Sequence, residues 1–374
     1  MNQLVNTHLA ATGSTKVDPV LQAATWELPL PTAQTTGRHT LICRSVQQET
    51  HDVKTFTFST PDYARFYFEP GQFLTLTLEI NGEMVSRCYT ISSSPTRPHS
   101  ISITVKRVTD GLISNWLHDH LKVDDEVGAF DPAGEFTPVG IKAEKLLLLS
   151  AGSGITPSMS MARAYADLGI KKDIVFVHNA RSPKDIIFHH ELVRFTQLNP
   201  HFKLVTICDQ PGEKSDYDGL IGRLDAAVLA THIPDFAERE VFVCGPAGYM
   251  SYVNKLLLDH GFPAKQYHQE SFSIETVTPV TTETNPDTCK IELTKSGKTF
   301  EVKSTDNLML MIKSQGVPVP SSCGQGVCGT CKTKLVSGQV EMKHQGGIRQ
   351  REIDKGFILL CCSKPVTPKL VLEL

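Results

Sequence analysis

The chain has 374 residues, of which 40% are hydrophobic and 21% charged, so it is long enough for two or three domains with well-filled cores. Its formal net charge of −3 gives no reason to expect a nucleic acid partner. The N-terminal stretch has no basic segment followed by a long apolar run, and the longest aliphatic run, residues 146–149, is too short to cross a membrane. We therefore expect a cytoplasmic protein that has no signal peptide and binds neither nucleic acid nor membranes.

Residues 1–36 show no sustained periodicity, so we expect an irregular N-terminal extension. The next segment has the pattern of short strands. In residues 72–80 (QFLTLTLEI) leucine alternates with threonine, and residues 101–108 (ISITVKRV) show a similar alternation of apolar and polar side chains. This period of two, with frequent turn residues, predicts an antiparallel sheet or barrel over residues 37–141.

The pattern then changes to continuous apolar strands that alternate with helical stretches. Met161, Tyr165 and Leu168 recur at the spacing of a helix within residues 158–169. Strand–helix alternation predicts a parallel, doubly wound sheet over residues 142–272, because continuous apolar strands need cover on both faces. The expected strands are KLLLLSAG, DIVFVHNA, FKLVTICD, EVFVCGP and KQYHQESF.

Residues 273–288 are rich in threonine and proline and poor in large apolar side chains, which predicts an extended linker. The last segment, residues 289–374, begins with a hairpin that turns at Ser296 and Gly297. A helix over 306–316, a cysteine-rich loop and further short strands follow. We therefore expect a third, small α+β domain.

The cysteine-rich loop reads SSCGQGVCGTCKTKL and holds Cys323, Cys328 and Cys331. Clustered cysteines in a reducing compartment more often bind metal or do redox work than form disulfides. The Cys-x4-Cys-x2-Cys spacing, with a distant fourth cysteine, is that of plant-type [2Fe–2S] sites, and the interleaved glycines let backbone N–H groups approach the sulfurs. Cys361 and Cys362 are both candidates for the fourth ligand. The alternatives are a structural zinc site and unpaired core cysteines.

Residues 87–90 (RCYT) end a strand of the expected barrel. The guanidinium of Arg87 suits a phosphate, and the flat phenol of Tyr89 suits a flat ring. Gly111 and Ser114 stand at the start of an expected helix, whose free N–H groups and positive dipole end also suit a phosphate. These residues fit a flavin nucleotide, although RCYT alone also fits a core tyrosine beside a surface arginine.

Residues 151–157 (AGSGITP) follow an expected strand and open a helix. Gly152 and Gly154 permit close approach of a pyrophosphate, and Thr156 lies in the same turn. Pro157 suits the first helical turn and stands where the full dinucleotide fingerprint has a third glycine. Because many α/β loops carry such a glycine turn, it indicates a nucleotide site only together with the neighbouring motifs.

Three further motifs follow strands of the expected parallel sheet, where such sheets bind ligands. Residues 244–250 (CGPAGYM) end the fourth strand, and residues 269–272 (QESF) end the fifth. Arg181 and Ser182 follow the second strand and could pair with a 2′-phosphate. The alternatives are a buried structural role for Cys244 and a plain surface charge for Arg181.

In this order, the motifs resemble those of the ferredoxin–NADP reductase superfamily with a C-terminal ferredoxin domain. The resemblance covers roughly residues 40–374 and implies a multidomain chain with an FAD-binding antiparallel β-barrel, an NAD-binding doubly wound α/β domain and a β-grasp ferredoxin domain. The expected flavin-binding residues are Arg87, Tyr89, Thr90, Gly111, Ser114, Glu270 and Phe272. The expected nicotinamide-nucleotide residues are Gly152, Gly154, Thr156, Pro157, Arg181, Cys244, Gly245 and Pro246.

The resemblance also implies roles for single residues. Thr90 would bond the N5 region of the flavin, and Cys244 would lie near the reacting carbon of the nicotinamide, so both are expected to be catalytic. The [2Fe–2S] cluster is expected on Cys323, Cys328, Cys331 and Cys361, with Cys362 a non-ligand. NADH is expected as the donor rather than NADPH.

Two groups within the superfamily look most similar: the reductase component of glycine betaine and related quaternary-amine monooxygenases, and the NADH reductase of the hybrid cluster protein. The function this implies is electron transfer from NADH through FAD and [2Fe–2S] to a partner protein, either a Rieske-type oxygenase or the hybrid cluster protein. Two other classes stay open: an electron-transfer or redox-sensing subunit without nucleotide turnover, and a metal-stabilised interaction protein.

The charge of the last domain gives one hint about the partner. Residues 289–374 contain 13 Lys and Arg against 7 Asp and Glu, a formal charge of +6. A basic docking face would steer an acidic partner, whereas evenly spread charges would simply be solvated.

Overall fold

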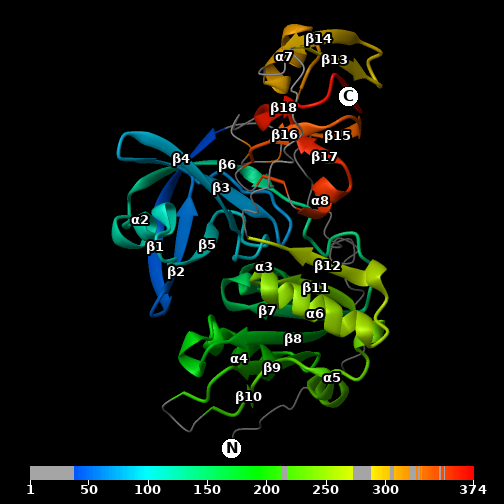
Figure 1. Ribbon diagram of the computed structural model, residues 1–374. Helices are drawn as coiled ribbons and strands as arrows, with labels where there is room; N and C mark the ends of the chain where they lie inside the picture. The colour runs from blue at the N-terminus through cyan, green and yellow to red at the C-terminus, as the bar shows by residue number, and fades with distance from the viewer. Residues whose placement is uncertain are drawn as a thin grey trace, which may run out of the picture.

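The computed structural model describes residues 38–212, 217–272, 288–303, 307–319, 326, 329, 331–344, 347–348 and 350–374. The expected extension 1–36, most of the expected linker 273–288, and Cys323 and Cys328 lie outside these residues. Figure 1 shows three sheets in chain order: a barrel in blue and cyan, a sheet in green and yellow, and a third in orange and red.

The first sheet is antiparallel throughout, with strand order β4-β3-β6-β1-β2-β5. A bridge between Ile91 and Ile103 joins its two edges, which closes it into the predicted barrel. Helix α2 (Leu112–Asp119) follows the fifth strand. The strands are β1 (Arg38–Thr50), β2 (Val53–Ser59), β3 (Phe73–Ile80), β4 (Glu83–Thr90), β5 (Ile101–Lys106) and β6 (Glu126–Ala133).

The burial of β3 does not follow the alternation of leucine and threonine in its sequence. Leu74, Leu76 and Leu78 fill the barrel core as expected, but Thr75 and Thr77 are buried too. The hydroxyl of Thr75 lies 3.3 Å from the sulfur of Cys88, its pair on β4, so the buried hydroxyl has a hydrogen-bond partner. A threonine in a strand therefore does not by itself mark a solvent-exposed face.

The second sheet is parallel throughout, with strand order β10-β9-β8-β7-β11-β12. Helices α3 (Ile155–Asp167) and α4 (His189–Leu198) share one apolar cluster with the sheet, and α5 (Ala226–His232) and α6 (Ala247–Asp259) share another. The doubly wound prediction is confirmed. The strands are β7 (Lys145–Ala151), β8 (Asp173–Ala180), β9 (Phe202–Cys208), β10 (Leu220–Ile221), β11 (Glu240–Cys244) and β12 (Tyr267–Glu270).

The third sheet is mixed, with strand order β14-β13-β19-β15-β17, because β13 pairs in parallel with β19. A two-stranded sheet and helices α7 (Leu308–Ser314) and α8 (Gln350–Asp354) complete this α+β domain. β13 begins at Thr288, which is the last residue of the expected linker 273–288. The strands are β13 (Thr288–Leu293), β14 (Thr299–Lys303), β15 (Lys332–Ser337), β16 (Val340–Met342), β17 (Phe357–Leu359), β18 (Ser363–Pro365) and β19 (Lys369–Leu372).

Short 3-10 turns connect several of these elements. They are η1 (Gly152–Gly154), η2 (Pro183–Asp185), η3 (Phe236–Glu238), η4 (Ala264–Gln266) and η5 (Leu360–Cys362). In the parts of the chain that the structure describes, every helix is too short or too polar to span a bilayer.

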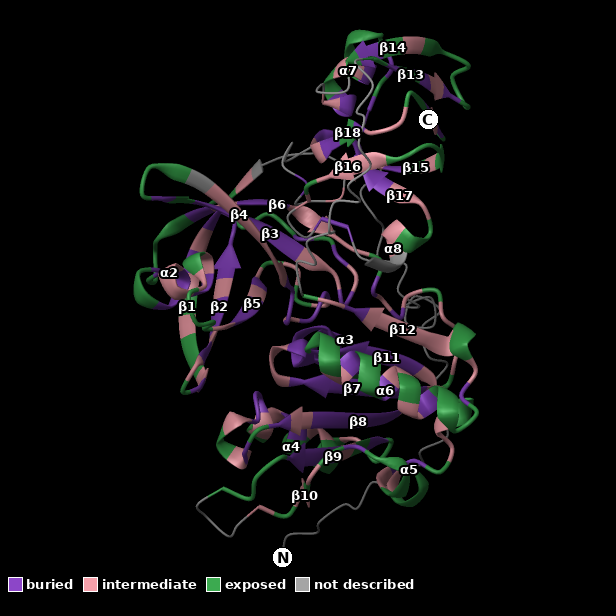
Figure 2. Ribbon diagram, in the orientation of Figure 1, coloured by how far each residue is buried: buried purple, intermediate pink, exposed green. Residues whose placement is uncertain are grey.

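The barrel and the parallel sheet pack through one continuous core. Val53 and Phe136 of the barrel region belong to the same buried cluster as Met159 and Met161 of α3. A Cβ atom at Gly71 of the barrel would stand 2.9 Å from Cε of Met161, so the two domains approach very closely here. Figure 2 shows buried residues running along β7, β8 and β11. This shared core holds the two domains in a fixed arrangement.

Candidate functional site

The flavin motif lies at the end of β4, where the barrel meets the second domain. Thr90 is buried, and Tyr89 packs partly buried against the barrel core. Burial raises the pKa of Tyr89, so the phenol stays neutral. The Nη2 atom of Arg87 donates a hydrogen bond of 3.2 Å to the carbonyl oxygen of Phe272, which ends the second domain. Two expected flavin residues that are 185 positions apart in the sequence thus meet.

The start of α2 supplies the second part of the expected flavin site. Gly111 is the N-cap residue, and no side chain caps the helix. A Cβ atom at Gly111 would lie 2.5 Å from Ser114 Oγ. That hydroxyl accepts the N–H of Val108 at 3.2 Å, so Ser114 shapes the loop before the helix. The first-turn N–H groups fit the phosphate role that the sequence suggests, because helix N-termini attract anions.

The glycine turn after β7 and the CGP motif after β11 touch each other. A Cβ atom at Gly154 would stand 2.3 Å from the Cys244 carbonyl oxygen and 2.6 Å from the Gly245 nitrogen. Gly152 has a φ of +54°, which favours glycine, and open space beside it. Helix α3 has no side-chain cap, and Thr156 instead donates to the Ser153 carbonyl at 3.1 Å. A cradle that any Cβ would fill, next to an uncapped helix end, fits a pyrophosphate.

Cys244 and Glu270 end adjacent strands and are paired in register. Cys244 has no exposed surface and belongs to the apolar cluster that Val53 and Phe136 of the barrel region also join. Its side chain therefore lies on the sheet face that is turned toward the barrel. Glu270 is also buried, on the neighbouring strand end. Both expected residues stand where the two domains meet.

A buried polar pair lies in the same region, and the motifs did not point to it. Ser150 Oγ and His178 Nδ1 are 2.9 Å apart, and neither residue has exposed surface. Burial lowers the pKa of His178 to about 3, so the imidazole is neutral near pH 7. The signal was present in the sequence as a polar residue ending each of two apolar strands, LLLLS and VFVH.

Arg181 is engaged with the barrel. Its Nη2 atom lies 3.2 Å from Asp52 Oδ2, in the β1–β2 turn, and Lys106 Nζ lies 3.4 Å from the same oxygen. Burial opposes the charge of Asp52, but Lys106 and the hydroxyl of Thr50 hold the pKa of Asp52 below its ordinary value. The next residue, Ser182, donates to Asp185 at 2.6 Å. Both groups that could bind a 2′-phosphate therefore already contact carboxylates.

The same cluster has the composition of a metal site, because oxygen and nitrogen atoms of His51, Asp52 and Asp185 lie within 4.8 Å of one another. Asp52, however, already pairs with two cationic side chains. We therefore interpret the cluster as ion pairs between the domains.

Cys331 and Cys361 are buried and close together. The N–H of Gly326 donates to Cys361 Sγ at 3.2 Å, and the N–H of Cys361 donates to Cys331 Sγ at 3.4 Å. Backbone donors aimed at cysteine sulfurs are the donor set that an iron–sulfur cluster requires. Cys362 Sγ instead contacts the Leu359 carbonyl at 3.6 Å, which favours Cys361 as the fourth ligand.

Three cysteines outside these motifs behave differently. Burial raises the pKa of Cys43 to about 11 and also raises the pKa of Cys208 and Cys289. These three thiols are small apolar core residues rather than ligands.

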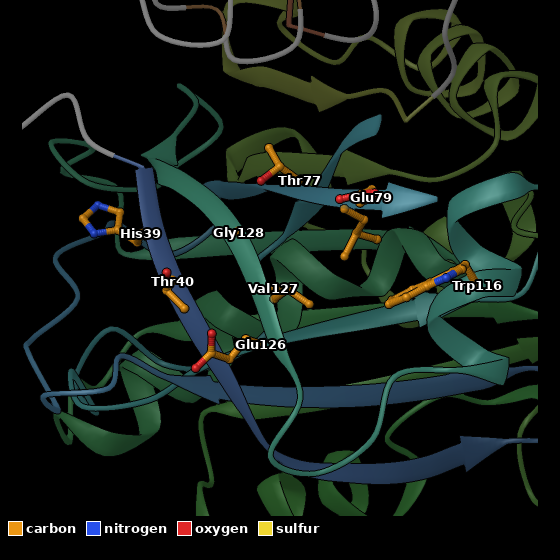
Figure 3. A pocket seen from close by; sticks show the side chains of 9 residues that line it. His39, Thr40, Thr77, Glu79, Trp116, Glu126, Val127 and Gly128 are labelled. Carbon is orange, nitrogen blue, oxygen red and sulfur yellow. The ribbon is translucent and has the colours of Figure 1, made fainter. Parts of the chain in front are cut away.

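A hollow of about 420 Å³ lies on the outside of the barrel (Figure 3). Strands β1, β3 and β6 and Trp116 of α2 line it. None of the residues expected from the sequence to bind a cofactor is among its lining residues. We therefore give this hollow no part in the electron path.

Three family models match the chain in the expected order. They are an oxidoreductase FAD-binding domain over residues 41–137, an oxidoreductase NAD-binding domain over 148–255 and a 2Fe-2S iron-sulfur cluster binding domain over 291–366. The predicted fold class and the predicted cofactors FAD, [2Fe–2S] and a nicotinamide nucleotide are confirmed.

Whole proteins match over nearly the full chain. The glycine betaine monooxygenase reductase subunit of Pseudomonas aeruginosa is 44% identical over 347 residues, covering 88% of this chain and 93% of the relative. The NADH oxidoreductase HCR of Escherichia coli is 34% identical, covering 90% and 98%. The solved structure of phthalate dioxygenase reductase, described as modular for electron transfer from pyridine nucleotides to [2Fe–2S], is 26% identical with a TM-score of 0.56 and coverages of 90% and 98%.

Proposed function

Because the chain belongs to the family of reductases that join an FAD-binding, an NAD-binding and a 2Fe-2S domain, we propose that it is the reductase component of an oxygenase acting on glycine betaine or a related quaternary amine. The chain is an NAD(P)H-dependent oxidoreductase, and such components pass electrons to a terminal oxygenase. The observation that carries the proposal is the contact of Gly154 with Cys244, because it joins the glycine turn to the CGP motif beside an apolar cluster that Val53 and Phe136 of the barrel region share.

Residues from both domains would hold FAD. Arg87 would bind the pyrophosphate together with the first turn of α2, at Gly111 and Ser114. Tyr89 would pack on the ring system, with Thr90 at its reactive edge. Glu270 and Phe272 would close the site from the second domain, and the Arg87–Phe272 hydrogen bond supports this arrangement.

The nicotinamide nucleotide would bind across the strand ends of the parallel sheet. Gly152, Gly154, Thr156 and Pro157 would hold its pyrophosphate, and Cys244, Gly245 and Pro246 would line the ring. Bound FAD supplies the conversion of an electron pair, received as hydride, into the single electrons that the cluster takes. The chain would orient the two rings, and the apolar cluster that Cys244 shares with Val53 and Phe136 would exclude water beside them.

The cluster would be held by Cys323, Cys328, Cys331 and Cys361. The two described ligands are buried and receive backbone N–H donors. Lys332, next to Cys331, lies 3.0 Å from Glu135, which follows the last barrel strand. This ion pair links the third domain to the barrel and supports electron transfer between them.

We further propose that NADH is the donor. A 2′-phosphate would have to displace Asp52 from Arg181 and Asp185 from Ser182, and would then face two carboxylates. The 2′-hydroxyl of NADH carries no charge and meets no such repulsion. A cytoplasmic location is part of the same proposal, since both the donor and the reduced cysteines belong there.

Anaerobic reduction tests the whole path. NADH should bleach the flavin and the cluster of the purified protein, and a quaternary-amine oxygenase should then reoxidise it rapidly. The 34% identity to HCR favours a second candidate, in which the hybrid cluster protein is the acceptor. Rapid reoxidation by the hybrid cluster protein, with none by the oxygenase, would select the second candidate.

A further inference from the structure

Helix α3 connects the two halves of the hydride-transfer site. Its first turn follows the glycine turn proposed to bind the nucleotide. Most of the helix is buried between the parallel sheet and the barrel, including all residues from 155 to 162. Its far face contacts residues 92–97, the loop that begins two residues after Thr90. One rigid element therefore reaches both the nucleotide turn and the flavin strand.

The contacts with the loop are polar and regularly spaced. Ser160 Oγ donates to the Ser93 carbonyl at 2.7 Å, and Arg163 Nη1 donates to the Ser92 carbonyl at 2.6 Å. One turn further, Asp167 accepts from Thr96 at 2.5 Å. Positions three and four apart lie on one helix face, so these side chains form a single row against the loop.

Arg163 is the central member of this row. Its Nε and Nη2 atoms bind the Glu191 carboxylate of α4 at 2.8 and 2.5 Å, while Nη1 binds the Ser92 carbonyl. The guanidinium also lies over the ring of Phe188, 4.5 Å from its centroid. With all three nitrogens engaged and the side chain only 14% exposed, the guanidinium plane is fixed.

We propose that Arg163 is a positioning residue for hydride transfer, which holds the segment after Thr90 at a fixed place relative to the nucleotide turn. This inference rests on the proposed function. Hydride transfer needs reacting atoms about 3–3.5 Å apart, and a shift of about 1 Å can cost about 100-fold in rate. Only Ile91 separates Thr90 from Ser92, so a displaced loop moves Thr90 directly.

A purely structural role for Arg163 makes a different prediction. Losing interface stability would lower the melting temperature and FAD content but leave the hydride step of intact molecules unchanged. Losing position would slow the hydride step in molecules that still hold FAD and still bind NADH. The two roles therefore separate in the limiting rate of flavin reduction at saturating NADH.

The experiment compares Arg163→Met and Arg163→Lys with the matched control Arg194→Met, which removes an exposed arginine from α4. Anaerobic stopped-flow reduction over a range of NADH concentrations gives a limiting rate and a dissociation constant. FAD content, melting temperature and amide hydrogen exchange of residues 91–97 are measured on the same samples. Ser160→Ala is added in case Arg163→Met does not fold.

We expect Arg163→Met to lower the limiting rate about 10- to 100-fold, with the NADH dissociation constant within about twofold of the parent and FAD retained. Exchange in residues 91–97 should rise. Arg163→Lys should recover part of the rate, because lysine can reach one oxygen but cannot form the fork. Ser160→Ala should lower the rate less than Arg163→Met, and Arg194→Met should match the parent.

An unchanged limiting rate in Arg163→Met, or in both Arg163→Lys and Ser160→Ala where the methionine variant does not fold, overturns the inference. A rate loss that tracks only FAD loss does the same. If the parent protein itself is not reduced by NADH, the proposed function has failed instead, and the two failures are thus distinguishable.

Discussion

Gly154 lies against the backbone of Cys244 so closely that a Cβ atom there would stand 2.3 Å from the Cys244 carbonyl oxygen. Two loops that are some ninety residues apart in the sequence are thereby placed in direct contact at the end of the parallel sheet. Backbone atoms on both sides leave no flexible group that could yield.

Gly154→Ala should therefore push the two loops apart. We expect the dissociation constant for NADH to rise by about tenfold or more, because the pyrophosphate cradle and the ring-lining motif no longer fit one nucleotide. Titration of the purified variant with NAD⁺ or stopped-flow reduction measures this. Gly248→Ala is the control, since a Cβ atom there meets nothing within 4 Å. Normal nucleotide affinity in Gly154→Ala would place the nucleotide elsewhere.

Asp52→Asn should relax the choice of nucleotide. Arg181, which is 63% exposed, would be released from its carboxylate partner and could bind a 2′-phosphate. A regained charge-assisted contact of about 1.4 kcal/mol corresponds to about a tenfold rise in kcat/KM for NADPH relative to NADH. Asp62→Asn, at an exposed carboxylate of the barrel domain, is the control. An unchanged ratio would remove Arg181 from the nucleotide site.

His178 should make the fold sensitive to acid. Its folded pKa of about 3 lies below the ordinary value of 6.5, so between these values the unfolded chain binds a proton that the folded chain does not. Stability is therefore fully present above about pH 6.5 and is lost as the pH falls, by about 1 kcal/mol per pH unit. Urea unfolding of the parent and His178→Asn at pH 7.5 and 5.5 measures the slope. Equal slopes in the two proteins would contradict the assignment.

Cys331→Ser should remove the cluster and leave the flavin reducible by NADH, because the two cofactors occupy separate domains. Cys362→Ser should keep the cluster, since its sulfur contacts the Leu359 carbonyl, whereas the Cys361 sulfur accepts the N–H of Gly326. Visible absorbance and iron analysis of anaerobically prepared protein test both variants. Zinc in place of iron, or cluster loss in Cys362→Ser with Cys361→Ser harmless, would require a different ligand set.

The sequence predicted the architecture because period and motif order are local signals. Continuous apolar strands such as KLLLLSAG indicated a doubly wound sheet whose two faces are both covered by helices. The contacts between domains left no such signal. Arg163 with Ser92 and Asp52 with Arg181 each join a segment of the second domain to a segment of the barrel, so nothing in either segment alone reveals the partner.

The charge of the last domain gives a final prediction about the partner. Lys364 is exposed on β18, three residues after Cys361, whereas Lys295 lies in the β13–β14 hairpin at the opposite end of the domain in Figure 1. If an acidic partner docks near the cluster, Lys364→Glu should slow electron transfer at low salt by several-fold, and the effect should fade as ionic strength rises, because salt screens exposed charges. Lys295→Glu should have a smaller effect. Stopped-flow reoxidation of the reduced protein by the oxygenase, from about 20 mM to about 500 mM salt, spans the range over which the screening length falls from about 20 Å to about 4 Å. A rate that ignores both salt and Lys364→Glu would show that apolar contacts rather than charge guide the partner.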